Sequence, residues 1–109
     1  MNIALRNEID TVVKTIADTG LVSKIILFGS LARGEETSVS DIDLCALTPI
    51  KDRHPTDITI DLRMKLYETQ KFPLDLFTYN QDDFLHHAKR PTSFEHEIAK
   101  HGVILYERG

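Results

Sequence analysis

Two short apolar segments, separated by a polar stretch, constrain the fold of this chain more than any other feature. The first, Lys24–Phe28 (KIILF), stops at a Gly-Ser pair, and the second, residues 41–47 (DIDLCAL), alternates before it turns apolar and ends ahead of Pro49. Both patterns are typical of strands. Because helical patterns precede and follow them, we predict an α/β or α+β architecture around one small sheet.

Two longer segments predict amphipathic helices. The N-terminal segment carries an apolar stripe at helical spacing up to Gly20, where glycine suits a C-terminal stop. A second helix is expected over residues 57–71, where apolar residues recur at every fourth position. The apolar positions of the two stripes are Leu5, Ile9, Val12, Val13 and Ile16, and Ile58, Leu62 and Leu66.

The remainder of the chain predicts a third strand and two short helices. The strand is expected over residues 72–79 (FPLDLFTY). Asn80 is expected to cap one short helix, and Thr92, with a glutamate three positions later, matches the capping box of a last helix, which Gly102 ends. The final VILYE adds a fourth strand or packs as a tail.

Length and charge narrow the class of protein. A chain of 109 residues predicts a single domain over residues 1–109. The net charge of -4 argues against a general nucleic-acid binder. Cys45 is the only cysteine, which fits a reducing compartment, and no apolar run reaches the roughly 20 residues of a membrane span. We therefore expect a cytoplasmic protein.

Polar residues next to the predicted strands are the candidates for chemistry. At Gly29-Ser30, backbone N–H groups and a hydroxyl suit phosphate oxygens, although most such pairs are simple turns. Asp41 and Asp43 would share one face of a strand, and their repulsion favours a hard cation such as Mg²⁺ over the alternative of solvated surface aspartates. Asp75 stands alone among apolar residues, so three carboxylates converge if its strand neighbours theirs.

Gly29-Ser30, ten further residues and Asp41-Ile42-Asp43 form the pattern GS-x10-DxD. In this pattern the chain resembles the DNA polymerase β-like nucleotidyltransferase superfamily, and LARGEETSVS and DIDL resemble its small prokaryotic members, the minimal nucleotidyltransferases. Asp75 falls where the family has its third carboxylate, and the tail SFEHEIAKHGVILYER is similar to the usual end of these proteins. The resemblance implies a small mixed sheet flanked by helices.

The resemblance also implies an activity, the transfer of a nucleoside monophosphate from a triphosphate such as ATP to a hydroxyl, with loss of pyrophosphate. Gly29 and Ser30 would hold the β,γ-phosphates, and Arg33, equally readable as a solvated helix residue, could reach phosphate as well. Asp41 and Asp43 would bind the Mg²⁺ that bridges the triphosphate. Asp75 would complete a second Mg²⁺ site and help to deprotonate the attacking hydroxyl. The three aspartates are thus the expected catalytic and metal-binding residues.

The acceptor is expected on a partner protein, because nothing is left over after the nucleotide-binding core. The minimal nucleotidyltransferases are typically paired with a small helical HEPN-domain protein, and the MntA-type antitoxins among them add AMP to a tyrosine of a HEPN ribonuclease toxin. The resemblance therefore implies a protein adenylyltransferase antitoxin in a hetero-oligomer with its toxin, without direct nucleic-acid binding. Two alternatives stay open, a transferase acting on an aminoglycoside-like small molecule and a non-catalytic module that masks the HEPN partner.

Other reactive side chains have simpler interpretations. Cys45 is expected to be a small core residue rather than a nucleophile. The histidines match no zinc-ligand spacing, which favours solvated or capping roles. The basic segment HHAKR, residues 86–90, is interpreted as a solvated helix end, although contact with a partner or with phosphates is open.

Overall fold

The computed structural model describes residues 2–35 and 41–108. The strands form a four-stranded sheet in the order β3-β2-β1-β4, in which β1 is antiparallel to β2 and β4, and β2 is parallel to β3. This mixed sheet with flanking helices confirms the predicted fold class. In chain order the elements are α1 (Ile3–Asp18), β1 (Lys24–Phe28), α2 (Gly29–Ala32), β2 (Ile42–Thr48), α3 (Pro55–Leu66), β3 (Leu74–Asn80), α4 (Gln81–Ala88), α5 (Phe94–His101) and β4 (Val103–Glu107).

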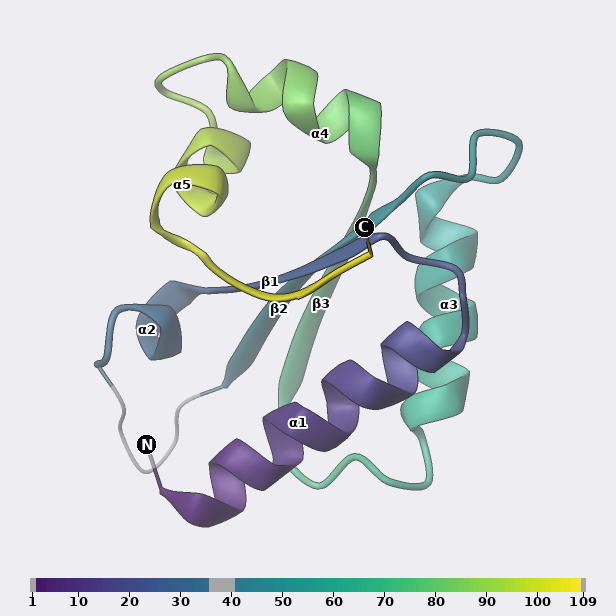
Figure 1. Ribbon diagram of the computed structural model, residues 1–109, viewed down its shortest axis with the longest axis vertical. Helices are drawn as coiled ribbons and strands as arrows, with labels where there is room; N and C mark the ends of the chain where they lie inside the picture. The colour runs from purple at the N-terminus through teal and green to yellow at the C-terminus, as the bar shows by residue number, and fades with distance from the viewer. Residues whose placement is uncertain (1, 36–40, 109) are drawn as a thin grey trace.

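Helices cover both faces of the sheet, α1 and α3 on one side and α4 and α5 on the other (Figure 1). The larger of two apolar cores lies under α1 and α3 and includes the stripe residues predicted for both helices apart from the partly buried Val13. The smaller core lies under α4 and α5 and consists of Ile26, Phe28, Cys45, Leu47, Phe84 and Ile98. Within residues 2–35 and 41–108, no helix is both long and apolar enough to cross a membrane.

The N-terminal helix forms as predicted, with one addition. The Asn2 side chain accepts a hydrogen bond from the Leu5 N–H at 2.7 Å, and Gly20, with φ +73°, follows the last turn. Glu8 is buried within the apolar stripe, where its carboxylate accepts hydrogen bonds from the N–H groups of Lys71 and Phe72. This carboxylate therefore connects α1 to the loop that leads into β3.

The second long helix differs from its prediction at both ends. It begins at Pro55, which suits a first helical position, after His54 Nδ1 accepts a hydrogen bond from the Thr56 N–H at 3.1 Å. It ends at Leu66 rather than at residue 71, because the N–H groups of Thr69 and Gln70 both turn back to the Leu66 carbonyl. The expectation of a helix through residue 71 was wrong.

The C-terminal elements follow the predicted order. Asn80 caps α4 by accepting hydrogen bonds from the N–H groups of Asp82 and Asp83, at 2.9 and 3.3 Å. The cap of α5 is Ser93 rather than Thr92, since the Ser93 hydroxyl accepts from the His96 N–H at 3.0 Å. Gly102 ends α5, as predicted. The final VILYE forms strand β4 beside β1, so of the two alternatives left open by the sequence, a fourth strand or a packed tail, the strand is observed.

Candidate active site

Two of the predicted carboxylates lie side by side on neighbouring strands. Asp43 on β2 is directly opposite Asp75 on β3 in the parallel register. Both side chains point to the face of α4 and α5, because their neighbours Ile42, Leu74 and Leu76 belong to the core under α1 and α3. Asp75 is exposed and Asp43 is partly buried. The condition stated from the sequence, that the strand of Asp75 neighbours the strand of Asp43, is therefore met.

This arrangement makes ionisation of Asp43 unfavourable. Partial burial, the charge of Asp75, a hydrogen bond to Asp75 and the charge of Asp41 together raise the pKa of Asp43 to about 6, against a small opposing effect of Arg33. Burial contributes most, because a desolvated carboxylate loses hydration when it ionises. A cation between the carboxylates would relieve both penalties.

Asp41 lies one residue before β2 rather than on it and is exposed. The strand starts at Ile42, whose N–H donates to the Pro73 carbonyl at 3.0 Å. The prediction that the strand includes Asp41 was therefore wrong, although the charge of Asp41 still raises the pKa of Asp43. Among residues 2–35 and 41–108, no three side chains of metal-binding type are gathered closely enough to hold an ion as they stand. Two adjacent carboxylates with a third nearby nevertheless match the oxygen ligands that Mg²⁺ prefers.

The Gly-Ser pair forms the junction between β1 and α2, as predicted. Gly29 has φ +74°, a region that glycine adopts readily. A Cβ atom at Gly29 would collide with Oδ2 of Asp43 and lie 3.1 Å from its Cγ. Glycine is therefore needed here to make room for the Asp43 carboxylate, a reason beyond the close approach of phosphate inferred from the sequence.

Comparison with known proteins identifies the family. Residues 10–109 match the model of the family described as polymerase beta, nucleotidyltransferase. The chain belongs to this family. It is 34% identical over 87 residues to the protein named "Putative protein adenylyltransferase MJ0604" from Methanocaldococcus jannaschii, which covers 80% of this chain and 81% of that protein. The chain is a nucleotidyltransferase.

A solved structure shares the fold of this nucleotidyltransferase. It is the crystal structure of a "putative nucleotidyltransferase" from Sulfolobus solfataricus, with a TM-score of 0.62 and 18% sequence identity. The likeness covers 94% of this chain and 79% of the other. At this identity it bears on the fold alone, and it confirms a nucleotidyltransferase fold.

Arg33 follows α2 directly and is exposed. Its Nε lies 3.1 Å from Oε2 of Glu35, in an ion pair on the surface. Its positive charge lowers the pKa of Asp43, against the larger effects that raise it. A contact between Arg33 and phosphate stays a prediction.

An aromatic cluster beside the carboxylates in this nucleotidyltransferase was not predicted from the sequence. The rings of Phe28, Phe77 and Phe94 contact one another, with centroids 5.6 to 6.0 Å apart. Phe28 is buried, whereas Phe77 and Phe94 are exposed. Strand alternation in FPLDLFTY already places Phe77 on the face of Asp75, so the sequence contained this signal.

The remaining reactive side chains have structural roles. Cys45 is buried in the smaller core, and burial raises the pKa of its thiol to about 12, which confirms a core residue. The Tyr79 hydroxyl donates to Oε2 of Glu95 at 2.9 Å and thereby joins β3 to α5. Burial, followed by this contact, raises the pKa of Tyr79. His96 Nδ1 lies 2.8 Å from the Ala88 carbonyl, so it links α5 to α4.

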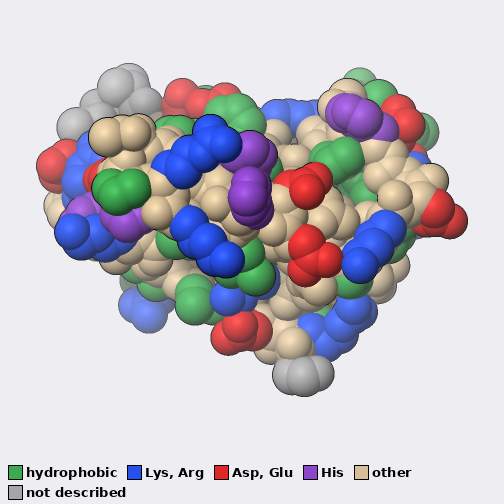
Figure 2. Space-filling view, turned by 90° about the horizontal axis from the view of Figure 1, so that it is seen from above, with side chains coloured by type: hydrophobic (Ala, Val, Ile, Leu, Met, Phe, Trp, Pro, Cys, Tyr) green, Lys and Arg blue, Asp and Glu red, His purple; other side chains and the backbone are tan. Residues whose placement is uncertain are grey.

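The face seen in Figure 2 carries lysine, arginine and histidine side chains together with acidic ones. Lys89 and Arg90, at the end of HHAKR, are exposed just after α4, as expected for a solvated helix end. A binding role for this segment stays untested. These side chains add positive charge to the same side of the molecule as the carboxylate pair.

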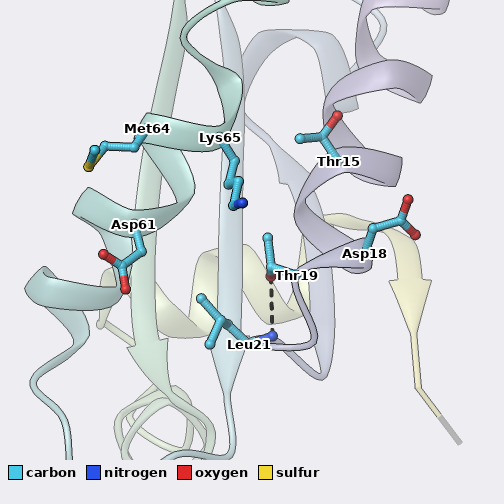
Figure 3. Close-up of a pocket in the computed structure, with 7 residues that line it drawn as sticks. All are labelled: Thr15, Asp18, Thr19, Leu21, Asp61, Met64 and Lys65. Atoms are coloured by element: carbon cyan, nitrogen blue, oxygen red, sulfur yellow. Dashed lines mark hydrogen bonds between the residues drawn. The ribbon is translucent and has the colours of Figure 1, made fainter.

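A wide hollow lies on the opposite side, between α1 and α3 (Figure 3). It measures about 660 Å³ and is lined by Thr15, Asp18, Thr19, Leu21, Asp61, Met64 and Lys65. Its carboxylates already have cationic partners, Lys14 for Asp18 and Arg53 for Asp61. The Thr19 hydroxyl donates to the Ile16 carbonyl and accepts from the Leu21 N–H. The polar groups of this hollow therefore have partners within the chain, and the carboxylate pair stays the predicted site of this nucleotidyltransferase.

Proposed function

We propose that this nucleotidyltransferase is a Mg²⁺-dependent protein adenylyltransferase, which transfers AMP from ATP to a hydroxyl of a partner protein. The observation that carries the proposal is the direct pairing of Asp43 with Asp75, next to the glycine of the β1–α2 junction. The named activity of the M. jannaschii relative supports the choice of AMP and of a protein acceptor.

In this proposal each polar residue has a defined role. Asp41 and Asp43 hold the Mg²⁺ that carries the triphosphate, and Asp75 completes a second Mg²⁺ site. The bound metal supplies charge neutralisation for the entering and leaving oxygens. The N–H groups and hydroxyl of Gly29-Ser30 bind the β,γ-phosphates, and Arg33 adds positive charge at the same side.

The order of the strands sets the direction from which the acceptor hydroxyl attacks in this proposal. The phosphates are held after β1, and Asp75 lies two strands away on β3. The attacking hydroxyl therefore approaches from the side of Asp75, opposite the leaving pyrophosphate, as in-line displacement requires. The new bond joins the acceptor oxygen to the α-phosphorus, the bond from the α-phosphorus to the bridging oxygen breaks, and Asp75 takes the proton.

The proposed acceptor is a tyrosine of a HEPN-domain ribonuclease toxin, which the modification silences. The support for this partner is the resemblance of the sequence to antitoxins of the same family. The transferase then acts as the antitoxin of a two-protein pair, and nucleic acid is the substrate of the toxin alone.

Intact-mass spectrometry of the partner tests the proposal. The product of the neighbouring gene, which we expect to be a HEPN-domain protein, is incubated with ATP, Mg²⁺ and the purified transferase. We expect its mass to increase by whole AMP units with the wild type and not with Asp75→Asn. A partner that is neutralised but unmodified, equally by both variants, would favour the masking module. Transfer of AMP to an aminoglycoside and not to the protein would favour the small-molecule transferase.

A further inference from the structure

Two phenylalanines beside the carboxylate pair expose much of their surface. Phe77 is 43% exposed and Phe94 is 50% exposed, although both contact the buried ring of Phe28. Phe77 stacks on Phe28 with centroids 5.8 Å apart, and Phe94 meets both rings edge-on, at 5.6 and 6.0 Å. Phe77 and Phe94 thus pack against the buried ring of Phe28 and leave part of their own apolar surface exposed, where a flat ligand can bind.

The position of Phe77 relative to the carboxylates is set by strand geometry. Phe28, Asp43 and Asp75 form one row across β1, β2 and β3, and Phe77 lies two residues beyond Asp75 on the same face. Two residues along a strand span about 7 Å. A six-membered ring that lies against Phe77 can therefore direct a substituent towards Asp75.

The strand order decides which substrate meets this surface. The glycine junction follows β1, whereas Phe77 lies on β3, at the edge of the described sheet. With the phosphates at the junction and the attacking hydroxyl at Asp75, Phe77 lies on the side of the acceptor. Phe94 contacts Phe77 and extends from there to a small hollow that it lines together with Gly29 and Arg33. A ligand can approach Phe77 past β3, because that strand has β2 as its neighbour in the sheet and no strand of the described residues on its other side.

We propose that Phe77 and Phe94 form the binding site for the aromatic ring of the acceptor, a tyrosine side chain. This inference rests on the proposed function and adds the residues that select the acceptor. The tyrosine ring packs on the two phenylalanines, and its hydroxyl points along β3 to Asp75. Serine and threonine also carry a hydroxyl, but they lack the ring that this surface accommodates. Phe77 and Phe94 thus select tyrosine through binding and take no part in proton transfer.

The chain has no tryptophan, so one introduced at this site reports on binding by fluorescence. The variant Phe77→Trp is titrated with N-acetyl-L-tyrosinamide, with N-acetyl-L-serinamide and with ATP plus Mg²⁺, with excitation selective for tryptophan. We expect the tyrosine compound alone to shift or quench the emission. A response to ATP and none to the tyrosine compound would assign the rings to the nucleobase instead, and no response to any ligand would overturn the site.

Kinetics with the HEPN-domain protein provide the second test. We expect Phe77→Leu to raise the acceptor KM about fivefold, the scale of one lost aromatic contact, while the KM for ATP is unchanged. Tyr67→Leu is the matched control, because Tyr67 is exposed on the opposite side, beyond the end of α3. An unchanged acceptor KM in Phe77→Leu would contradict the proposal. If the wild type modifies no protein, the proposed function fails, and the fluorescence titration still decides whether the rings bind a tyrosine side chain.

Discussion

The two faces of the sheet are built from alternating residues of the same strands, yet they differ in what they bury. On β2, Ile42 and Leu44 are fully buried under α1 and α3, whereas Asp43 between them is only partly buried on the other side. On β3, Leu76 is buried, and Asp75 and Phe77 on either side of it are exposed. One face of the sheet carries the larger core, and the other leaves Asp43 partly accessible and Asp75 exposed to solvent.

The charges differ in the same way. Around the hollow between α1 and α3, both carboxylates have cationic partners. On the other face, neither Asp43 nor Asp75 forms an ion pair with any residue that the structure describes, and burial together with the charge of Asp75 raises the pKa of Asp43. A site that binds a cation must leave its carboxylates available, and the larger core stabilises the fold that holds them there. Under the proposed function, one face of the sheet thus mainly stabilises the fold, and the other carries the groups for the transfer reaction.

The sharpest test of this division is Asp43→Asn. The transfer rate should fall roughly a hundred- to a thousand-fold, the scale of one lost charge interaction in a transition state. The free energy of unfolding should stay equal or increase, because the variant removes repulsion from Asp75 without creating a cavity. Labelled ATP measures the rate, and chemical denaturation measures stability. A variant that loses both activity and stability would show that the carboxylates also support the fold.

The converse test is Leu62→Ala on α3, at a fully buried position under the opposite face. The cavity should lower the free energy of unfolding by about 2–5 kcal/mol. Transfer per folded molecule, measured well below the melting temperature, should not change. A loss of activity in fully folded protein would mean that the larger core positions the active site beyond merely stabilising it.

Strand alternation made much of this division predictable from the sequence. Leu74, Asp75 and Leu76 alternate in a way that only a strand with one apolar face accommodates, so the exposure of Asp75 followed directly. The parallel pairing with β2, which brings Asp75 opposite Asp43, depends on long-range topology and could be stated only as a condition.

The errors lie where long-range contacts decide local structure. No glycine or proline follows Leu66 before Pro73 to mark the end of α3 in the sequence. In the structure, the buried carboxylate of Glu8 binds the N–H groups of Lys71 and Phe72 and supports the turn there. Glu95 suited a capping box in the sequence, yet its carboxylate is bonded to the Tyr79 hydroxyl instead. A side chain at Gly29 would collide with Asp43, which lies fourteen positions further along the chain. The local sequence around Gly29 therefore could not predict this collision.

Gly29→Ala and Gly20→Ala form a matched pair that isolates this collision. Both glycines have nearly the same positive φ, +74° and +73°, but a Cβ atom at Gly20 meets nothing within 4 Å. Backbone strain should therefore cost both variants about 1 kcal/mol of stability. Gly29→Ala should cost more, and it should also slow transfer, since the Asp43 side chain must move. Equal stability and equal activity in thermal melts and transfer assays would show that Asp43 adjusts freely.

The smallest expected effect is the pH dependence of stability in metal-free protein. The pKa of Asp43 is raised from 3.8 to about 6 on folding, so the folded state binds its proton more tightly than the unfolded state. The resulting stabilisation is complete below the lower value and is lost as the pH rises through the upper one. Asp43→Asn lacks this titration. Its melting temperature should therefore match that of the wild type near pH 4 and exceed it increasingly up to about pH 7, by a modest amount because Asp43 is only partly buried. A difference that does not change with pH would indicate that neither burial nor the charge of Asp75 opposes ionisation of Asp43, and the contrast in charge between the two faces would then be lost.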